Sequence, residues 1–169
     1  MNPKLLVLTI MLILTSCQKG EEELVVVPKN FTGTILVIYN QKSGHPILYQ
    51  EGKRVLVIPE NGILTTSCTP NTDWSRPIQF YYGTIAPEHE IPNFDNNKNF
   101  NQNLNNIPQD VVGAFDVMLG SITKVLPNGN QEKIIFSQFL ICTKKDLAHY
   151  RQQARQINID ELVDAYELP

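Results

Sequence analysis

The sequence predicts a mainly β fold, an antiparallel β-sandwich-like domain that ends in one or two helices. Two observations support this prediction. Short apolar runs rich in valine and isoleucine recur along the chain, separated by glycine, proline and asparagine, as in strands joined by tight turns. Apolar residues at helical spacing appear only after residue 143. Elements of these two kinds in this order are typical of a sandwich with a helical flank.

The first part of the chain, from residue 25 to about residue 66, predicts strands. Residues 34–39 and 54–58 are continuous apolar runs, which suits strands buried on both faces. Residues 59–62 are Pro-Glu-Asn-Gly, in which proline fixes φ and Asn-Gly tolerates the positive φ of a tight turn. We therefore expect residues 63–66 to return as the second strand of a hairpin.

The middle of the chain predicts further strands and one long loop. Residues 79–82 form an aromatic strand candidate, and residues 111–119 are ambiguous, with strand preferred. The stretch at about 93–106 is rich in asparagine and lacks periodicity, so we expect a surface loop. Residues 121–126 and 132–142 flank the turn sequence Pro-Asn-Gly-Asn and predict a hairpin whose second strand is apolar on both faces.

The C-terminal residues predict helices. Thr143 supplies a hydroxyl N-cap and Asp146 an acidic residue three positions later, which is a helix-start signature. The apolar face of this helix would be made by Leu147, Tyr150, Ala154 and Ile157. A second short helix is expected at about residues 160–167.

The first sixteen residues have the composition of a secretory signal. Lys4 precedes an apolar run at residues 5–14, and small residues follow it. This run is shorter than the roughly 20 residues that a membrane-spanning helix needs. The sequence Leu14-Thr15-Ser16-Cys17 resembles the lipobox of bacterial lipoproteins. The resemblance implies cleavage before Cys17 and a lipid on its thiol, which would anchor the chain to a membrane of the cell envelope.

Cleavage at this position would divide the chain into three parts. Residues 1–16 would be a signal peptide, residues 17–24 the lipidated cysteine with a polar tether, and residues 25–169 a single domain. The tether contains Lys19 and three glutamates, and it resembles signals that export some lipoproteins to the cell surface. The alternative is a periplasm-facing position, so the face of the membrane stays open.

The composition narrows the class of protein. The 153 residues after the signal suffice for one domain with a sizeable core. The net charge is −3 for the whole chain and −4 without the signal, which contains one lysine. A mildly acidic chain without basic clusters argues against a nucleic-acid partner and against electrostatic docking to anionic lipid.

Two cysteines, Cys68 and Cys142, remain if Cys17 carries lipid. In an oxidising compartment they could form a disulfide, and the alternative is two separately buried thiols. Cys142 lies in a predicted apolar strand, where burial would raise the pKa of its thiol and make it unreactive.

Turn and strand motifs are spread over most of the mature chain. They are residues 27–33 (Val-Pro-Lys-Asn-Phe-Thr-Gly), 38–41, 52–55, 58–64, 79–82 and 140–146. Together they resemble a family of uncharacterised bacterial lipoproteins that contain a domain of unknown function. The resemblance implies a β-rich fold and a place in the envelope, and it implies no chemistry.

Few residues suggest catalysis, and no cofactor site is expected. The sequence lacks the common serine-hydrolase, phosphate-loop and zinc-protease motifs. The one tight acid–histidine group is Glu88-His89-Glu90, which would need ligands from elsewhere to hold a metal.

An aromatic group is the other candidate for binding. Trp74, Tyr81 and Tyr82 could form a platform that stacks on sugars, or they could cover an edge of the sheet.

We therefore expect a membrane-anchored envelope lipoprotein that acts as a non-catalytic binding module, with a protein or glycan partner. The alternative is an enzyme or a ligand- or metal-binding protein with an unconventional site near Glu88-His89-Glu90. A pocket that joins His45 or His89 to carboxylates would favour this alternative.

Overall fold

The computed structural model describes residues 20–72, 78–94, 104–126 and 128–167. Its strands are β1 (Glu23–Val27), β2 (Gly33–Ile38), β3 (Leu48–Gln50), β4 (Lys53–Val57), β5 (Ile63–Thr65), β6 (Ile78–Tyr82), β7 (Glu90–Ile91), β8 (Val112–Val125) and β9 (Gln131–Thr143). The α-helices are α2 (Leu147–Ala154) and α3 (Ile159–Glu167), and short 3-10 helices lie at η1 (Pro87–His89), η3 (Leu104–Asn106) and η4 (Lys144–Asp146).

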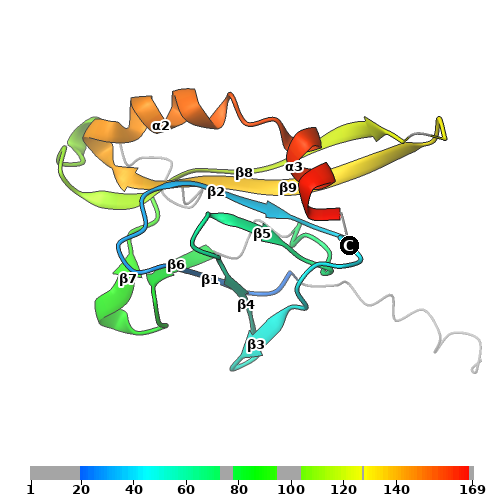
Figure 1. Ribbon diagram of the computed structural model, residues 1–169. Coiled ribbons are helices and arrows are strands. Elements are labelled where there is room, and N and C mark those ends of the chain that lie inside the picture. The colour runs from blue at the N-terminus through cyan, green and yellow to red at the C-terminus, as the bar shows by residue number, and fades with distance from the viewer. Residues whose placement is uncertain (1–19, 73–77, 95–103, 127, 168–169) are drawn as a thin grey trace, which may run out of the picture.

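The strands form two stacked sheets, as Figure 1 shows. The five-stranded sheet, sheet A, has the order β3-β4-β1-β6-β7. The four-stranded sheet, sheet B, has the order β5-β2-β9-β8. The predicted mainly β, sandwich-like fold with C-terminal helices is thus confirmed. The antiparallel part of that prediction is wrong, because β1 is parallel to β4 and β6, and β2 is parallel to β5. In each case the chain visits the other sheet between the two strands, which allows the second strand to return in the same direction.

The predicted hairpin at residues 54–66 is wrong. The turn at residues 59–62 forms, with the Gly62 amide donating to the Pro59 carbonyl at 2.9 Å, but β4 and β5 belong to different sheets. Gly62 has a φ of +78°, and a Cβ on it would lie 2.7 Å from the Thr34 carbonyl oxygen. The tight turn therefore carries the chain from one layer to the other. Both strands are apolar on both faces, so the sequence pattern could not distinguish this crossover from a hairpin.

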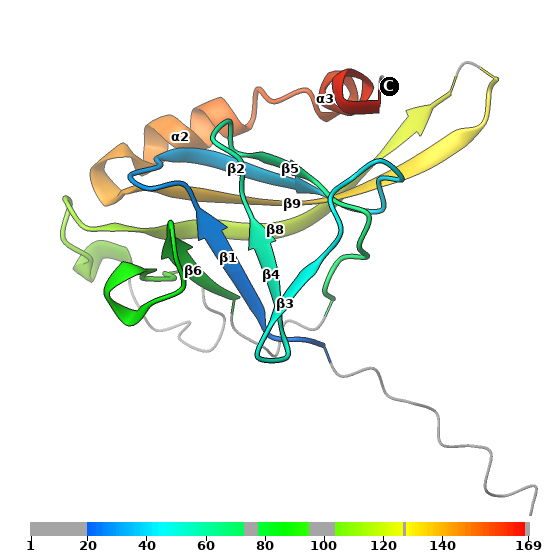
Figure 2. The ribbon, with the colours of Figure 1, turned by 60° about the horizontal axis from the view of Figure 1, so that its bottom comes forward.

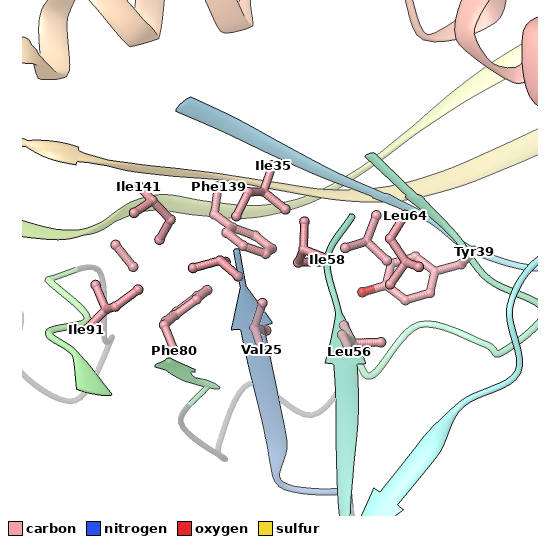
Figure 3. Close-up of a cluster of buried hydrophobic side chains, with 13 residues drawn as sticks. Val25, Ile35, Tyr39, Leu56, Ile58, Leu64, Phe80, Ile91, Phe139 and Ile141 are labelled. Atoms are coloured by element: carbon pink, nitrogen blue, oxygen red, sulfur yellow. The ribbon is translucent and has the colours of Figure 1, made fainter. Parts of the chain in front are cut away.

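The main core lies between the two sheets, and Figure 3 shows it in close-up. Sheet A contributes Val25, Val27, Leu56, Ile58, Phe80 and Ile91, and sheet B contributes Ile35, Val37, Leu64, Ala114, Phe139 and Ile141. At its centre, the rings of Phe80 and Phe139 meet edge to face with centroids 4.9 Å apart. The buried face of each strand follows the alternation of a pleated sheet.

The outer face of sheet B is covered by the two α-helices (Figure 1). Leu147 and Ala154 of α2 pack on Phe115, Leu140 and Cys142, and Val163 of α3 packs on a separate cluster that includes Ile134. The helical segment begins after Thr143 as predicted, first as the 3-10 turn η4 and then as α2. The predicted hydroxyl cap does not form, because the Thr143 hydroxyl donates to the Asp146 carboxylate at 2.5 Å and, among the described residues of the first turn, accepts no hydrogen bond from a backbone amide.

The long hairpin of β8 and β9 is confirmed, with Val125 opposite Gln131 near its turn. A β-bulge after Phe115 places Asp116 at a φ of +53°. The Asp116 carboxylate accepts two hydrogen bonds from the Arg151 guanidinium, at 2.6 and 2.7 Å, which ties α2 to β8.

The domain begins earlier than the expected boundary at residue 25. Glu23 opens β1, and both Glu23 and Leu24 are buried rather than part of a solvated tether. Most of the expected asparagine-rich loop, residues 95–103, lies outside the described residues. None of the helices in the described ranges is long and apolar enough to cross a membrane.

Candidate functional site

A groove runs along the free part of strand β4. β3 pairs with β4 only from Lys53 to Val55, so residues 56–57 have no strand on that side in the described part of the chain. The groove has a volume of about 410 Å³. It is lined by His45 and Pro46 before β3, by Leu48 of β3, by residues 55–59, and by Leu64 and Thr66 of the β5 region.

Two exposed apolar side chains flank this groove. Leu48 is 53% exposed and Val57 is 50% exposed, whereas most large apolar residues of both sheets are buried. Leu56 and Ile58 alternate with Val57 and point into the core, as Figure 3 shows for both. The groove therefore places exposed apolar surface directly beside the main core, a combination typical of contact surfaces.

One wall of the groove depends on the close approach of residues 44–45 to β5. The Thr66 hydroxyl donates to the His45 carbonyl at 2.7 Å, and the His45 amide donates to the Thr65 carbonyl at 2.9 Å. A Cβ on Gly44 would lie 2.6 Å from the Thr66 carbonyl carbon, so the chain can approach this closely because residue 44 is glycine.

A buried charged pair lies next to the groove, at the start of the parallel strands of sheet A. Glu23 of β1 is in register with Arg54 of β4, and the two residues are only 4% and 5% exposed. Arg54 Nε lies 4.0 Å from Glu23 Oε2 and 3.3 Å from Glu21 Oε2, and the guanidinium donates to the Thr69 carbonyl at 2.6 Å. Among the described residues, neither Arg54 Nε nor Glu23 Oε2 has a hydrogen-bond partner.

Burial controls the protonation of Glu23. Loss of solvent raises the pKa of this carboxyl from its ordinary value of 4.5 to about 7, while the Arg54 charge pulls the pKa down and the Glu21 charge raises it further. With this pKa, the Glu23 carboxyl changes between its protonated and its ionised form near neutral pH. Burial also raises the pKa of Tyr39, whose hydroxyl shares a 3.0 Å hydrogen bond with Ser137 in sheet B.

Only an indirect signal for the charged pair and the groove is present in the sequence. Glu23 and Arg54 are opposite charges that each precede an apolar run, but their pairing depends on the register of two strands that are distant in sequence. The groove likewise depends on where β3 begins, at Leu48, which no local motif marks.

The acid–histidine group at Glu88-His89-Glu90 lies in η1 and the start of β7, and all three residues are exposed. The His89 Nδ1 atom shares a 2.7 Å hydrogen bond with the Thr84 hydroxyl. Within the described ranges, no group of three or more histidine, cysteine, aspartate or glutamate side chains could hold a metal ion. His45 lines the groove, and no carboxylate lines it with His45.

The tyrosines proposed as a platform point to opposite faces of sheet A. Tyr81 packs in a small outer-face cluster with Leu24, Val26 and Val55, whereas Tyr82 packs against the main core and donates to the Phe31 carbonyl at 3.0 Å. They therefore cannot form one flat surface together. Trp74 and the proposed lipid site, Cys17, lie outside the described residues.

The two remaining cysteines are free thiols, so the structure contains no disulfide between these two described residues. Cys68 packs against the main core, and its sulfur lies 3.2 Å from the oxygen of the Thr66 hydroxyl, which donates its proton to the His45 carbonyl. Cys142 lies on the other side of sheet B, under α2, where burial raises the pKa of its thiol to about 11, as predicted for an unreactive cysteine.

Comparison with known proteins adds a family match for the first part of the chain. Residues 19–93 match the model of a family of unknown function (DUF6843). The matched residues include every strand of sheet A, the groove and the charged pair. This match supports the resemblance to an uncharacterised family.

No curated protein matches the chain. Among solved structures, the chain is similar to the crystal structure of a "Putative Lipoprotein from Bacillus anthracis". The two are 14% identical, with a TM-score of 0.47 over 72% of this chain and 69% of the other.

Proposed function

We propose that this protein is a lipid-anchored protein of the bacterial cell envelope that binds a partner protein through the groove beside β4. The apolar run at residues 5–14 and the sequence Leu14-Thr15-Ser16-Cys17 support the anchor, because a signal of this length that ends in a lipobox-like motif directs lipid to the cysteine. The observation that carries the binding role is the groove itself, flanked by the half-exposed side chains of Leu48 and Val57.

The backbone of the groove favours an extended protein segment as the partner. The amides of Arg54 and Ile58 donate to carbonyls of Glu22 and Val26 on the β1 side. Because backbone groups alternate along a strand, the N–H and C=O of Val57 point to the groove side. An extended segment could pair with these groups and cover the apolar side chains, which is a common mode of peptide recognition.

Site-specific photo-crosslinking in native membranes tests the binding role. A photoreactive amino acid replaces Val57 in one variant and Val125 in the other. Val125 is a matched control because it is a valine, 65% exposed, at the far end of the β8–β9 hairpin. We expect a discrete crosslinked protein from position 57 and none from position 125. Equal products from both positions, or none from position 57, would contradict the proposed groove.

A further inference from the structure

The polar segment before β1 is held against the β3–β4 hairpin. The Tyr49 hydroxyl lies 3.2 Å from both carboxylate oxygens of Glu21, and Lys53 Nζ lies 3.0 Å from Glu22 Oε2. The domain therefore fixes the chain from Glu21 onward. Only four residue steps separate Glu21 from Cys17, and a chain of that length spans at most about 14 Å. If Cys17 carries the anchor, this hairpin lies next to the membrane.

The hairpin presents side chains that suit the interface between water and lipid. All three residues of β3 are exposed, and Leu48 and Tyr49 are 53% and 55% exposed. Successive side chains on a strand point to opposite faces, so this edge strand offers apolar surface on both sides. Tyrosine is enriched at the headgroup level of membranes because its ring is apolar and its hydroxyl is polar.

The charges near the hairpin favour a zwitterionic lipid surface. Among the described residues here, the carboxylates of Glu21, Glu22 and Glu51 lie near the half-buried Lys53, and the other nearby cation, Arg54, is buried. An excess of carboxylates is repelled by the negative potential of anionic lipids. Attraction to such a surface must therefore come from the apolar and aromatic side chains.

We propose that the β3–β4 hairpin, residues 48–53, rests at the headgroup level of the membrane that holds the Cys17 lipid, with Leu48 and Tyr49 in contact with zwitterionic lipid. This inference rests on the lipid anchor of the proposed function. It places one end of the groove, at Leu48, beside the headgroups, so that a partner would enter the groove along the membrane surface.

The test uses the full-length mature lipidated protein bound to phosphatidylcholine vesicles. An environment-sensitive fluorescent amino acid stands at position 49 in one variant and at position 125 in another. Figure 2 shows that the tip of the β8–β9 hairpin points away from the β3–β4 hairpin, which makes position 125 the control. We expect brominated lipid to quench the label at position 49 several-fold more than the label at position 125. We also expect this difference to shrink when phosphatidylglycerol is added.

Vesicle flotation distinguishes failure of this inference from failure of the anchor. Protein that floats with the vesicles but shows equal quenching at both positions would overturn the hairpin contact and leave the anchor intact. Protein that does not float, like a Cys17→Ala control, would overturn the anchor and the hairpin contact together. Stronger quenching at position 49 on phosphatidylglycerol vesicles than on phosphatidylcholine would contradict the choice of a zwitterionic surface.

Discussion

The two sheets share one core but differ on their outer faces. The outer face of sheet B is covered by α2 and α3, and it adds two apolar clusters to the fold. No α-helix in the described part of the chain covers sheet A, which has one small outer cluster (Figures 1 and 2). Sheet A instead holds the buried charged pair, the strand β4 along which the groove runs, and the first described strand, β1. We infer that sheet B chiefly stabilises the domain and that sheet A carries the features that respond to a partner, to pH and to the membrane.

The largest expected effect comes from the core that joins the two sheets. Phe139→Ala removes a fully buried ring that meets Phe80, and such changes cost about 3–5 kcal/mol of unfolding free energy. Urea denaturation should show this loss in one transition, because both sheets pack on the same cluster. Val125→Ala, at an exposed site, should change stability by less than about 0.5 kcal/mol. Two separate transitions would show that the sheets unfold independently.

Sheet A should give the domain a pH dependence through Glu23. The pKa of this carboxyl is raised in the folded state from 4.5 to about 7, so its contribution to stability is full below pH 4.5 and is lost as the pH rises through about 7. The groups that face it are Arg54, Glu21 and Tyr39. Between pH 5 and pH 8 the loss should be about 2–3 kcal/mol.

The Glu23→Gln variant isolates this effect, because glutamine keeps the shape of the side chain and does not titrate. Its unfolding free energy, measured by urea denaturation at pH 5 and pH 8, should fall less than that of the wild type. An equal fall in both proteins would show that Glu23 does not cause the pH dependence.

The wall of the groove should be sensitive to Gly44. In Gly44→Ala the new Cβ would meet the Thr66 backbone at 2.6–2.7 Å, so the segment carrying His45 must move away from β5. Overpacking of this kind costs about 1–3 kcal/mol. Thermal unfolding measures the cost, and crosslinking from position 57 should weaken in the same variant.

Gly52→Ala is a control for the loss of a glycine without a steric clash, because no atom lies within 4 Å of a Cβ placed there. The φ of +76° at Gly52 disfavours alanine, so this control has a backbone cost of its own but should leave the crosslinking from position 57 unchanged. Unchanged stability and crosslinking in Gly44→Ala would contradict the importance of this close approach.

A smaller effect is expected on the helical side of sheet B. Arg151→Ala removes the two hydrogen bonds to Asp116 that tie α2 to β8. Both side chains are partly exposed, at 41% and 34%, so water screens the pair and the loss should be about 0.5–1 kcal/mol. Chemical denaturation measures it, with Arg155→Ala as a neighbouring control. A loss as large as that of Phe139→Ala would mean that α2 contributes to the main core.

The sequence predicted those parts of the fold that depend on local patterns. The β8–β9 hairpin has a strong turn signal between two apolar runs, and the helical segment after Thr143 begins with a hydroxyl and an acid at the spacing of a helix start. The pairing of β4 and β5 was mispredicted because a tight turn can reverse a strand within one sheet or carry it to another layer. That choice depends on strands distant in sequence, here β1 and β2.

The candidate site was less predictable than the fold. Because Glu23 follows two other glutamates, the sequence predicts that it belongs to a polar tether, yet the register of β1 with β4 buries it beside Arg54. Tyr81 and Tyr82 are adjacent in sequence, and the alternation of a strand separates them by the thickness of the sheet. In both cases the side chain's environment is set by strand position rather than by residue type.

Intact mass spectrometry of the protein extracted from bacterial membranes tests the central claim of the proposal, that a lipid on Cys17 anchors the domain to the membrane. We predict a chain that begins at Cys17 and carries a diacylglyceryl group on its thiol, with or without a further acyl chain on the new amine. We also predict that Cys17→Ala abolishes this species. A wild-type protein that carries no lipid, or lipid that persists in Cys17→Ala, would contradict the anchor.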